Sequence, residues 1–239
     1  MTEIFLDTAN LKEIEEIQGW NIISGITTNQ KIFEKEKGVN FKEHAKAILD
    51  MVYPLPVSLE GPNTLAGIIK VAKEFNHWET KGCPLKNFVV KVPMLGNGDG
   101  LRAVKKLSDM NIKTNVTACM SLNQTFLAVL AGATYVSLFY NRMMDWKTED
   151  TKLDFISKEH ALNIVRATQE FINNNKSDTQ LIVGSIRSPQ DITELVQLNP
   201  NVITIPYKIL KQMPQHDMTD KTLGEFEDAW REFKRYEKQ

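Results

Sequence analysis

Short apolar runs rich in β-branched residues alternate with longer amphipathic runs along the chain, and this alternation limits the possible folds more than any other feature. The runs that are typical of strands span residues 4–9, 22–29, 55–61, 87–94, 113–119, 134–140, 179–186 and 202–206. The runs between them repeat apolar residues at three- and four-residue spacing, as helices do. Strands that alternate with helices in this way pair in parallel, so the sequence predicts an α/β protein.

Eight strand–helix units in 239 residues favour a closed barrel over an open sheet. An open doubly wound sheet usually carries a glycine-rich nucleotide fingerprint after its first strand. Here the first strand runs into residues 7–10 without a glycine, and the glycine-rich residues 96–100 come after the fourth strand. We therefore predict a single (β/α)8 TIM barrel domain over residues 1–239, with an additional C-terminal helix at about residues 219–238.

Composition excludes several classes of partner. The formal net charge is −1, which does not suggest binding to nucleic acid. No apolar stretch approaches the roughly 20 residues of a membrane span, and the N-terminus lacks the basic and apolar regions of a signal peptide. The sequence predicts a soluble cytoplasmic protein with neither a nucleic-acid nor a membrane partner.

Polar side chains at the expected strand ends are the candidate functional residues, because active sites of such barrels lie at the carboxyl ends of the strands. These residues are Asp7, Thr27, Thr28, Asn29, Glu60, Lys91, Asn115, Thr117, Ser137, Arg142, Ser185 and Arg187. None of the four histidines lies at such an end, so a metal site is not expected.

Lys91 gives the sharpest signal, because it lies within the apolar run of residues 89–93. Burial disfavours the ammonium form and lowers the pKa of a lysine, which leaves a free amine able to attack a carbonyl carbon. Asp7 and Glu60 could move protons for such chemistry, directly or through a water held by Thr117. The alternative interpretation is a structural salt bridge between Lys91 and one of these carboxylates.

Arg142 and Arg187 follow the sixth and seventh expected strands. Barrel enzymes often bind phosphate in loops near this position, and two guanidinium groups with the Ser185 hydroxyl suit a tetrahedral dianion. Alternatively, both are surface arginines that pair with acidic neighbours such as Asp145. The aromatic residues in the range 226–233 predict helix packing, with a neighbouring subunit as one possible contact.

Seven short segments of the sequence match the motifs of a known protein family. They are residues 5–10 (FLDTAN), 25–29 (GITTN), 90–93 (VKVP), 115–117 (NVT), 131–137 (AGATYVS), 185–187 (SIR) and 226–230 (FEDAW). In this order they resemble the transaldolase family, and most closely its small subfamily, which also contains fructose-6-phosphate aldolases. The resemblance covers essentially the whole chain.

The resemblance implies a class I mechanism that needs no cofactor and no metal. Lys91 would attack the C2 ketone of a ketose phosphate, Asp7 would take the C4 hydroxyl proton, and Glu60 and Thr117 would hold the catalytic water. The implied substrate-binding residues are Asn29, Asn115 and Ser137 for the dihydroxyacetone unit, Arg142, Ser185 and Arg187 for the phosphate, with Thr27 and Phe139 beside them.

The implied activity is transfer of dihydroxyacetone from a fructose 6-phosphate or sedoheptulose 7-phosphate type of donor to an aldose phosphate in the pentose phosphate pathway. The resemblance also implies a homo-oligomer, a pentamer or decamer, in which the C-terminal helix reaches a neighbouring subunit. Glu60 and Phe139 match transaldolases, whereas fructose-6-phosphate aldolases tend to carry Gln and Tyr.

Three departures from the family pattern leave the substrate open. Gln30 and Leu138 stand where the family usually has proline, and the acidic connection at residues 141–157 is unlike the usual sequence. The alternatives are a fructose-6-phosphate aldolase and a transaldolase that cleaves a sulfonated ketose. Outside enzymes, the alternative is a silent sugar-phosphate-binding protein, which the presence of Lys91 and Asp7 disfavours.

Overall fold

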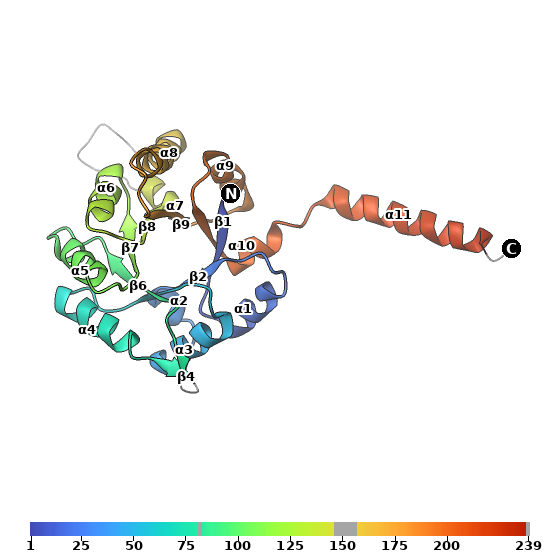
Figure 1. Cartoon of the computed structure of the whole chain (residues 1–239). Helices are drawn as coiled ribbons and strands as arrows, with labels where there is room; N and C mark the ends of the chain where they lie inside the picture. The colour runs from blue at the N-terminus through green and yellow to red at the C-terminus, as the bar shows by residue number, and fades with distance from the viewer. Residues whose placement is uncertain (81–82, 146–156, 238–239) are drawn as a thin grey trace.

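The computed structural model describes residues 1–80, 83–145 and 157–237 of the chain. Within these residues, eight parallel strands close into a barrel in the order β1-β10-β9-β8-β7-β6-β3-β2 (Figure 1). The strands are β1 (Glu3–Asp7), β2 (Gly25–Thr27), β3 (Val57–Glu60), β6 (Phe88–Pro93), β7 (Thr114–Cys119), β8 (Tyr135–Phe139), β9 (Gln180–Gly184) and β10 (Val202–Pro206). Each lies inside or within one residue of an expected strand, so the predicted (β/α)8 barrel is confirmed.

Helices surround the barrel and lie in the amphipathic runs between the strands, where the sequence predicts them. They are α1 (Leu11–Gln18), α3 (Phe41–Val52), α4 (Leu65–Phe75), α5 (Asp99–Ser108), α6 (Leu122–Leu130), α8 (Lys158–Asn174) and α9 (Pro189–Leu195), the last followed by a 3₁₀ turn at Val196–Leu198. Local caps explain several of these boundaries. Asn10 accepts hydrogen bonds from the backbone N–H groups of Lys12 and Glu13 at the start of α1, which is the typical role of an N-cap asparagine.

Several short elements have no counterpart in the sequence-based prediction. They are α2 (Gln30–Phe33), α7 (Tyr140–Met144), α10 (Tyr207–Gln212) and the two-residue strands β4 (Glu79–Thr80) and β5 (Cys83–Pro84). One or two helical turns are too short to show an apolar periodicity, so the pattern of residues could not predict them. Two of these helices, α2 and α7, directly follow barrel strands and carry residues of the candidate site.

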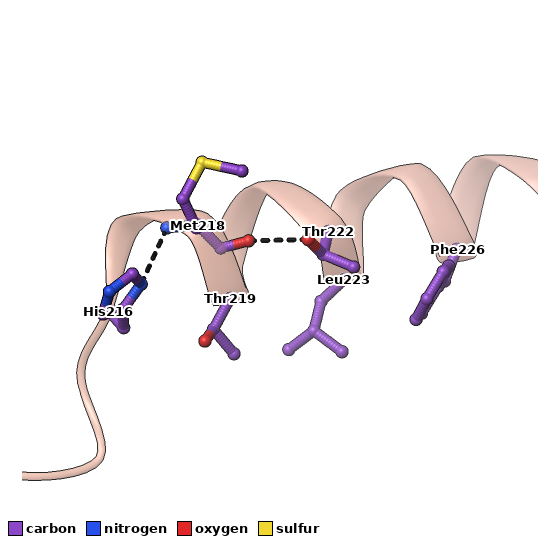
Figure 2. Close-up of a pocket in the computed structure, with 6 residues that line it drawn as sticks. All are labelled: His216, Met218, Thr219, Thr222, Leu223 and Phe226. Carbon is purple, nitrogen blue, oxygen red and sulfur yellow. Dashed lines mark hydrogen bonds between the residues drawn. The ribbon is translucent and has the colours of Figure 1, made fainter.

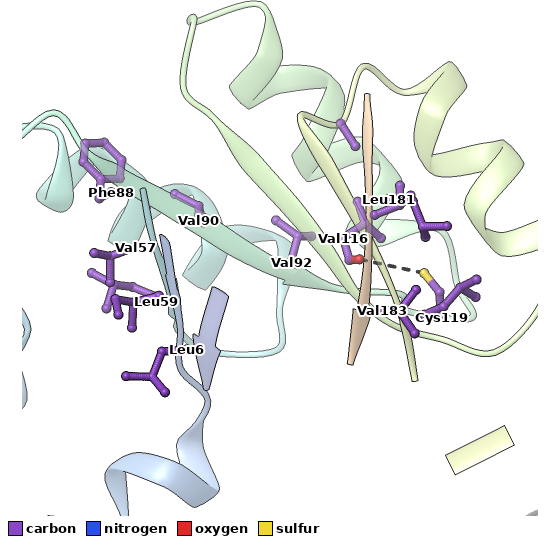
Figure 3. Packing of buried hydrophobic residues seen from close by; sticks show 14 of the residues in the cluster. Leu6, Val57, Leu59, Phe88, Val90, Val92, Val116, Cys119, Leu181 and Val183 are labelled. Atoms are coloured by element: carbon purple, nitrogen blue, oxygen red, sulfur yellow. Dashed lines mark hydrogen bonds between the residues drawn. The ribbon is translucent and has the colours of Figure 1, made fainter. Parts of the chain in front are cut away.

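Alternation along the strands sorts side chains between two apolar layers. Outward-facing residues such as Leu6, Val90 and Val183 pack between the strands and the helices (Figure 3). A separate buried cluster fills the inside of the barrel. It consists of Phe5, Val89, Tyr135, Ile182 and Val202. On each of these strands, the residue after the interior one faces outward, and the residue after that faces the barrel interior again.

Close packing inside the barrel also explains one glycine. Gly25 pairs in register with Phe5 on the neighbouring strand. A Cβ atom at Gly25 would lie only 2.7 Å from the Phe5 ring. The aromatic ring therefore takes the space that a side chain at Gly25 would need. It fills the barrel interior on the amino-terminal side of the polar strand ends.

The C-terminal helix α11 (Asp217–Tyr236) projects away from the barrel (Figure 1). This confirms the predicted helix, whose expected last residue, 238, lies outside the described residues. None of the α11 residues is buried in the described chain. Trp230 is 57% exposed, and Leu223, Phe226 and Phe233 are similarly exposed. Leu223 and Phe226 lie on one side of its first turns, together with His216 (Figure 2).

The described helices include none that combines the length and the apolar character required to cross a membrane.

Candidate active site

Lys91 lies in the middle of the barrel because it is two residues beyond the interior residue Val89 on β6. Its side chain is 5% exposed. Its Nζ donates a hydrogen bond to the backbone oxygen of Thr28 at 2.9 Å and lies 4.0 Å from Oε2 of Glu60. The salt-bridge interpretation therefore has only a long contact in its favour, since the amine lies closer to a neutral carbonyl than to Glu60.

Burial lowers the pKa of Lys91 below its ordinary value, while the charges of Glu60 and Asp7 act in the opposite direction. Desolvation is the larger effect because the amine lies inside the barrel, away from bulk water. A larger fraction of this lysine is therefore the uncharged amine at a given pH than for an exposed lysine, and only the uncharged amine is a nucleophile.

Asp7 is the last residue of β1 and, two residues beyond Phe5, faces the barrel interior. The Thr27 hydroxyl donates a hydrogen bond to Oδ1 of Asp7 at 2.7 Å. Burial raises the pKa of Asp7, whereas the Lys91 charge, the Thr27 hydrogen bond and the Lys35 charge lower it by less. Burial thus shifts Asp7 and Lys91 each toward the neutral form, and perturbed pKa values of this kind are common at functional sites.

Strand register places the other interior polar residues beside Lys91. Glu60 on β3 and Asn115 on β7 are its direct register partners. The Ser137 hydroxyl on β8 donates to Oδ1 of Asn115 at 2.7 Å, and Nδ2 of Asn115 donates to the Ser58 hydroxyl at 3.2 Å. These buried hydrogen bonds hold the Asn115 amide in one orientation.

Thr117 follows Asn115 on the same face of β7. Its buried hydroxyl has no hydrogen-bond partner among the described residues. The next residue, Ala118, has a φ of +61°, and the register between β7 and β8 shifts between Val116 and Cys119. Such irregularities commonly redirect a side chain at a sheet end. Here Thr117 lines a cavity of about 330 Å³ together with Glu60 and Lys91.

A second cavity of about 160 Å³ reaches Lys91 from the side of Asp7. It is lined by Asp7, Thr27, Asn29, Lys91, Ser137, Phe139, Arg142, Gly184, Ser185 and Thr204. Asn29, Lys91, Phe139 and Arg142 line both cavities. Twelve residues were given an implied catalytic or substrate-binding role, and ten of them, Phe139 included, line cavities that contain Lys91. Asn115 lies outside these linings and accepts a hydrogen bond from Ser137.

Arg187 is the predicted site residue that lies apart. Its Nη1 donates to Oδ1 of Asp145 at 2.8 Å, and its Nη2 contacts the other oxygen of the same carboxylate. It lines a neighbouring cavity of about 680 Å³ that also reaches Asp7 and Lys35. The pairing of Arg187 with Asp145 matches the alternative interpretation from the sequence, whereas Arg142 lines both cavities that contain Lys91.

Three residues at the site were absent from the sequence-based list or were given no role. Thr204 on β10 bonds to Thr27 through its hydroxyl, and Ser58 on β3 holds Asn115. Each is a polar residue in an apolar strand run, the same signal that identified Lys91. Thr28 contacts Lys91 through its backbone oxygen, for which a side-chain pattern gives no signal. In the acidic connection at 141–157, residues 146–156 lie outside the described residues.

Nearly the whole chain is similar to proteins of one family. The family model described as "Transaldolase/Fructose-6-phosphate aldolase" matches residues 4–239. A "Probable transaldolase" from Petrotoga mobilis is 39% identical over 236 residues, which cover 98% of this chain and 97% of that protein. One from Thermoanaerobacter sp. (strain X514) is 38% identical over 230 residues, covering 96% and 97%. One from Carboxydothermus hydrogenoformans is 36% identical over 234 residues, covering 98% and 100%.

Proposed function

The chain belongs to the transaldolase/fructose-6-phosphate aldolase family, and from this premise we propose that it transfers a dihydroxyacetone unit between sugar phosphates through a Schiff base on Lys91. The donor is a ketose phosphate of the fructose 6-phosphate or sedoheptulose 7-phosphate type, and the acceptor is an aldose phosphate. The observation that carries the proposal is the buried Lys91 amine, whose pKa is lowered by burial, between Asp7 and Glu60.

In the first half of the reaction, the uncharged Lys91 amine adds to the C2 carbonyl of the donor. The carbinolamine loses water, and a protonated Schiff base results. Asp7 then takes the proton of the C4 hydroxyl while the C3–C4 bond breaks. The bonding electrons move into the Schiff base, which becomes an enamine, and the shortened aldose phosphate leaves as an aldehyde.

In the second half, C3 of the enamine attacks the aldehyde carbon of the acceptor, and Asp7 returns a proton to the new hydroxyl. Water then hydrolyses the Schiff base and releases the new ketose phosphate. The Thr117 hydroxyl, which is buried and has no hydrogen-bond partner in the described part of the chain, is suited to bind the water that leaves and returns, with Glu60 beside it.

Substrate orientation follows from the polarity of the cavity. Ser137 and Asn29 line the cavity and would bind the hydroxyls of the dihydroxyacetone unit. Asn115, which accepts the hydrogen bond from Ser137, would complete this part of the binding site. Arg142 and Ser185 line the same cavity and would bind the phosphate. Arg187 joins them only if its guanidinium leaves Asp145.

The test of the proposal compares the fate of the enamine with and without an acceptor. With fructose 6-phosphate and erythrose 4-phosphate, the wild type should form sedoheptulose 7-phosphate much faster than fructose 6-phosphate alone yields free dihydroxyacetone. An ionised Glu60 only accepts hydrogen bonds, and Phe139 has no hydroxyl to relay a proton. The enamine therefore waits for an acceptor instead of being protonated.

Phe139→Tyr, alone or with Glu60→Gln, should raise release of dihydroxyacetone at the expense of transfer. Product detection by coupled assay or mass spectrometry gives the ratio of the two rates. A wild type that releases dihydroxyacetone as fast as it transfers it would replace the transaldolase proposal with the aldolase alternative.

Arg142→Ala should penalise phosphorylated substrates selectively. A charge-assisted hydrogen bond contributes roughly 1.5–3 kcal/mol, so kcat/KM on fructose 6-phosphate should fall about 10- to 150-fold. Trapping of free dihydroxyacetone on Lys91 by borohydride should change little. Arg187→Ala should have a smaller effect, because that side chain already pairs with Asp145.

Arg102→Ala on the outer helix α5 is the matched control for Arg142→Ala, since this exposed arginine pairs only with Asp99 among the described residues. It should leave both reactions unchanged. Equal losses for Arg142→Ala on phosphorylated and free substrates would argue against phosphate binding by this residue. Faster turnover of a sulfonated ketose than of its phosphate analogue would support anion binding by Arg142 but show that the substrate carries a sulfonate.

We also propose that the protein acts as a cytoplasmic homo-oligomer, a pentamer or decamer, in the pentose phosphate pathway. The support for assembly is the exposed apolar side of α11, where Phe226, Trp230 and Phe233 are each more than half exposed. A helix with such a side is typical of one that packs against another chain.

A further inference from the structure

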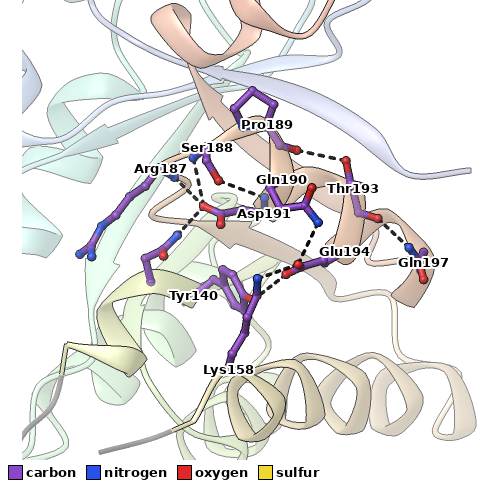
Figure 4. A network of polar contacts seen from close by, with 11 residues as sticks. Tyr140, Lys158, Arg187, Ser188, Pro189, Gln190, Asp191, Thr193, Glu194 and Gln197 are labelled. Carbon is purple, nitrogen blue, oxygen red and sulfur yellow. Dashed lines mark hydrogen bonds and ion pairs between the residues drawn. The ribbon is translucent and has the colours of Figure 1, made fainter.

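A buried carboxylate outside the Lys91 cavities has no part in the reaction described above. Asp191, on helix α9, is 7% exposed. Its Oδ2 accepts hydrogen bonds from the backbone N–H groups of Arg187 at 2.8 Å and Ser188 at 3.1 Å (Figure 4). It accepts a third hydrogen bond from Nδ2 of Asn141 at 2.7 Å. Only the bond from Ser188 belongs to the capping box that starts α9. The other two bonds connect Asp191 to chain segments outside its own helix.

Asn141 completes the connection. It is 8% exposed and directly precedes Arg142 on α7. Its Nδ2 also donates to the backbone oxygen of Ser185 at 2.8 Å. Asn141 and Asp191 therefore join the short helix that carries Arg142 to the β9–α9 loop that begins with Ser185. We call these two residues the Asn141–Asp191 pair.

Ser185 needs such support because its backbone is left-handed, with a φ of +64°. This conformation is unfavourable for a residue with a Cβ atom, so surrounding contacts have to hold it. The side chain of Ser185 lines the 160 Å³ cavity beside Lys91 and Arg142. Release of its carbonyl from Asn141 would let the backbone relax and move the hydroxyl.

We propose that the Asn141–Asp191 pair sets the specificity for anionic substrates by holding the Ser185 hydroxyl and the Arg142 guanidinium at a fixed separation. This inference rests on the phosphate-binding role proposed above for Arg142 and Ser185. Both members of the pair are positioning residues, since neither lines a cavity that contains Lys91.

The charge of Asp191 fits this role. Burial opposes ionisation of the carboxyl group, but the hydrogen bonds from Arg187, Asn141 and Ser188 outweigh it and hold the pKa below its ordinary value. The carboxylate therefore stays ionised over the whole neutral range, and hydrogen bonds to an ionised acceptor are stronger than those to a neutral one.

The test compares Asp191→Ala and Asn141→Ala with the wild type on anionic and uncharged ligands. Both variants should raise the KM for fructose 6-phosphate about tenfold and weaken binding of inorganic phosphate, measured by calorimetry, by a similar factor. Borohydride trapping of free dihydroxyacetone on Lys91 should stay within about twofold of wild type, because this ligand carries no anion. Asp191→Asn keeps an oxygen acceptor but not the charge, so it should restore part of the phosphate affinity that Asp191→Ala loses.

Thr193→Ala is the matched control, because Thr193 is an exposed residue of the same helix and its hydroxyl donates to the Pro189 carbonyl at 3.3 Å. It should leave both KM and phosphate affinity unchanged. Equal losses on charged and uncharged ligands, or the same losses in Thr193→Ala, would show a merely structural role and overturn the inference. If Asp191→Ala does not fold, Asn141→Ala decides the outcome by the same criteria.

The proposed function and this inference fail in different ways. A wild type that neither traps dihydroxyacetone on Lys91 nor converts fructose 6-phosphate would remove the proposed function, and the inference with it. A wild type that does both, with Asn141→Ala still binding inorganic phosphate as tightly as wild type, would remove the inference alone.

Discussion

Lys91→Met should abolish both transfer and covalent labelling. Borohydride added with fructose 6-phosphate should inactivate the wild type and attach a three-carbon or sugar adduct to Lys91, which peptide mass spectrometry locates. The thioether of methionine fills nearly the same space but cannot form a Schiff base. Turnover should fall by at least about 10⁴-fold, as expected when a covalent nucleophile is removed.

Lys113→Met is the matched control, since this lysine is exposed at the residue before β7. It should keep both turnover and the label at Lys91. A labelled peptide that contains a different lysine, or a Lys91 variant that still turns over, would exclude the proposed mechanism.

The same substitution should change how stability depends on pH. Because burial lowers the pKa of Lys91 in the folded state, the unfolded chain binds more protons between that pKa and about 10.5. The free energy of unfolding of the wild type should therefore rise with pH through this window. Lys91→Met should lose this rise, which urea denaturation at several pH values can measure. An unchanged pH dependence would mean that Lys91 is not shifted in the folded protein.

Asp7→Asn should block cleavage of the C3–C4 bond while it leaves Schiff-base formation in place. General base catalysis contributes about 10²- to 10⁴-fold, so kcat on fructose 6-phosphate should fall by that factor. An asparagine can still accept the hydrogen bond from Thr27. Borohydride should therefore still label Lys91 when free dihydroxyacetone is supplied. Loss of labelling together with turnover would place Asp7 in Schiff-base formation instead.

The pKa of Asp7 gives a second measurement. Burial raises this pKa above 3.8 in the folded state, so the wild type should lose kcat as pH falls through a value above 3.8. Its stability should also decrease as pH rises from 3.8 through the folded pKa, because the folded state there binds more protons. Asp7→Asn should remove this decrease, whereas Asp50→Asn on the exposed side of α3 should not.

Burial of the titratable groups Lys91 and Asp7 lowers the stability of the folded protein. Lys91 and Asp7 are both buried, and burial shifts each toward its neutral form. At neutral pH such shifts lower the free energy of unfolding relative to residues without charge. The barrel compensates through its two apolar layers, between which the strands lie.

The eight strands and the surrounding helices were predictable because barrel folding depends on local patterns. Runs such as residues 88–93 alternate between the barrel interior and the helix layer, and the chain records that alternation directly. Lys91 was recognisable for the same reason, since a lysine at an interior position contrasts with its apolar neighbours. Because active sites of such barrels lie at the carboxyl ends of the strands, Asp7, Glu60 and Thr117 could be predicted to lie near Lys91.

Only the tertiary structure shows which hydrogen-bond partners the polar side chains have. Arg187 could pair with a substrate anion or with Asp145, and both choices agree with the sequence; the structure shows the second. The backbone oxygen of Thr28 receives the Lys91 hydrogen bond only because β2 and β6 flank β3 in the closed sheet. Likewise, Asn141 and Asp191 are 50 residues apart and meet only in the fold. Strand periodicity is a local property of the chain, whereas hydrogen bonds between distant residues depend on how the strand ends and loops are packed.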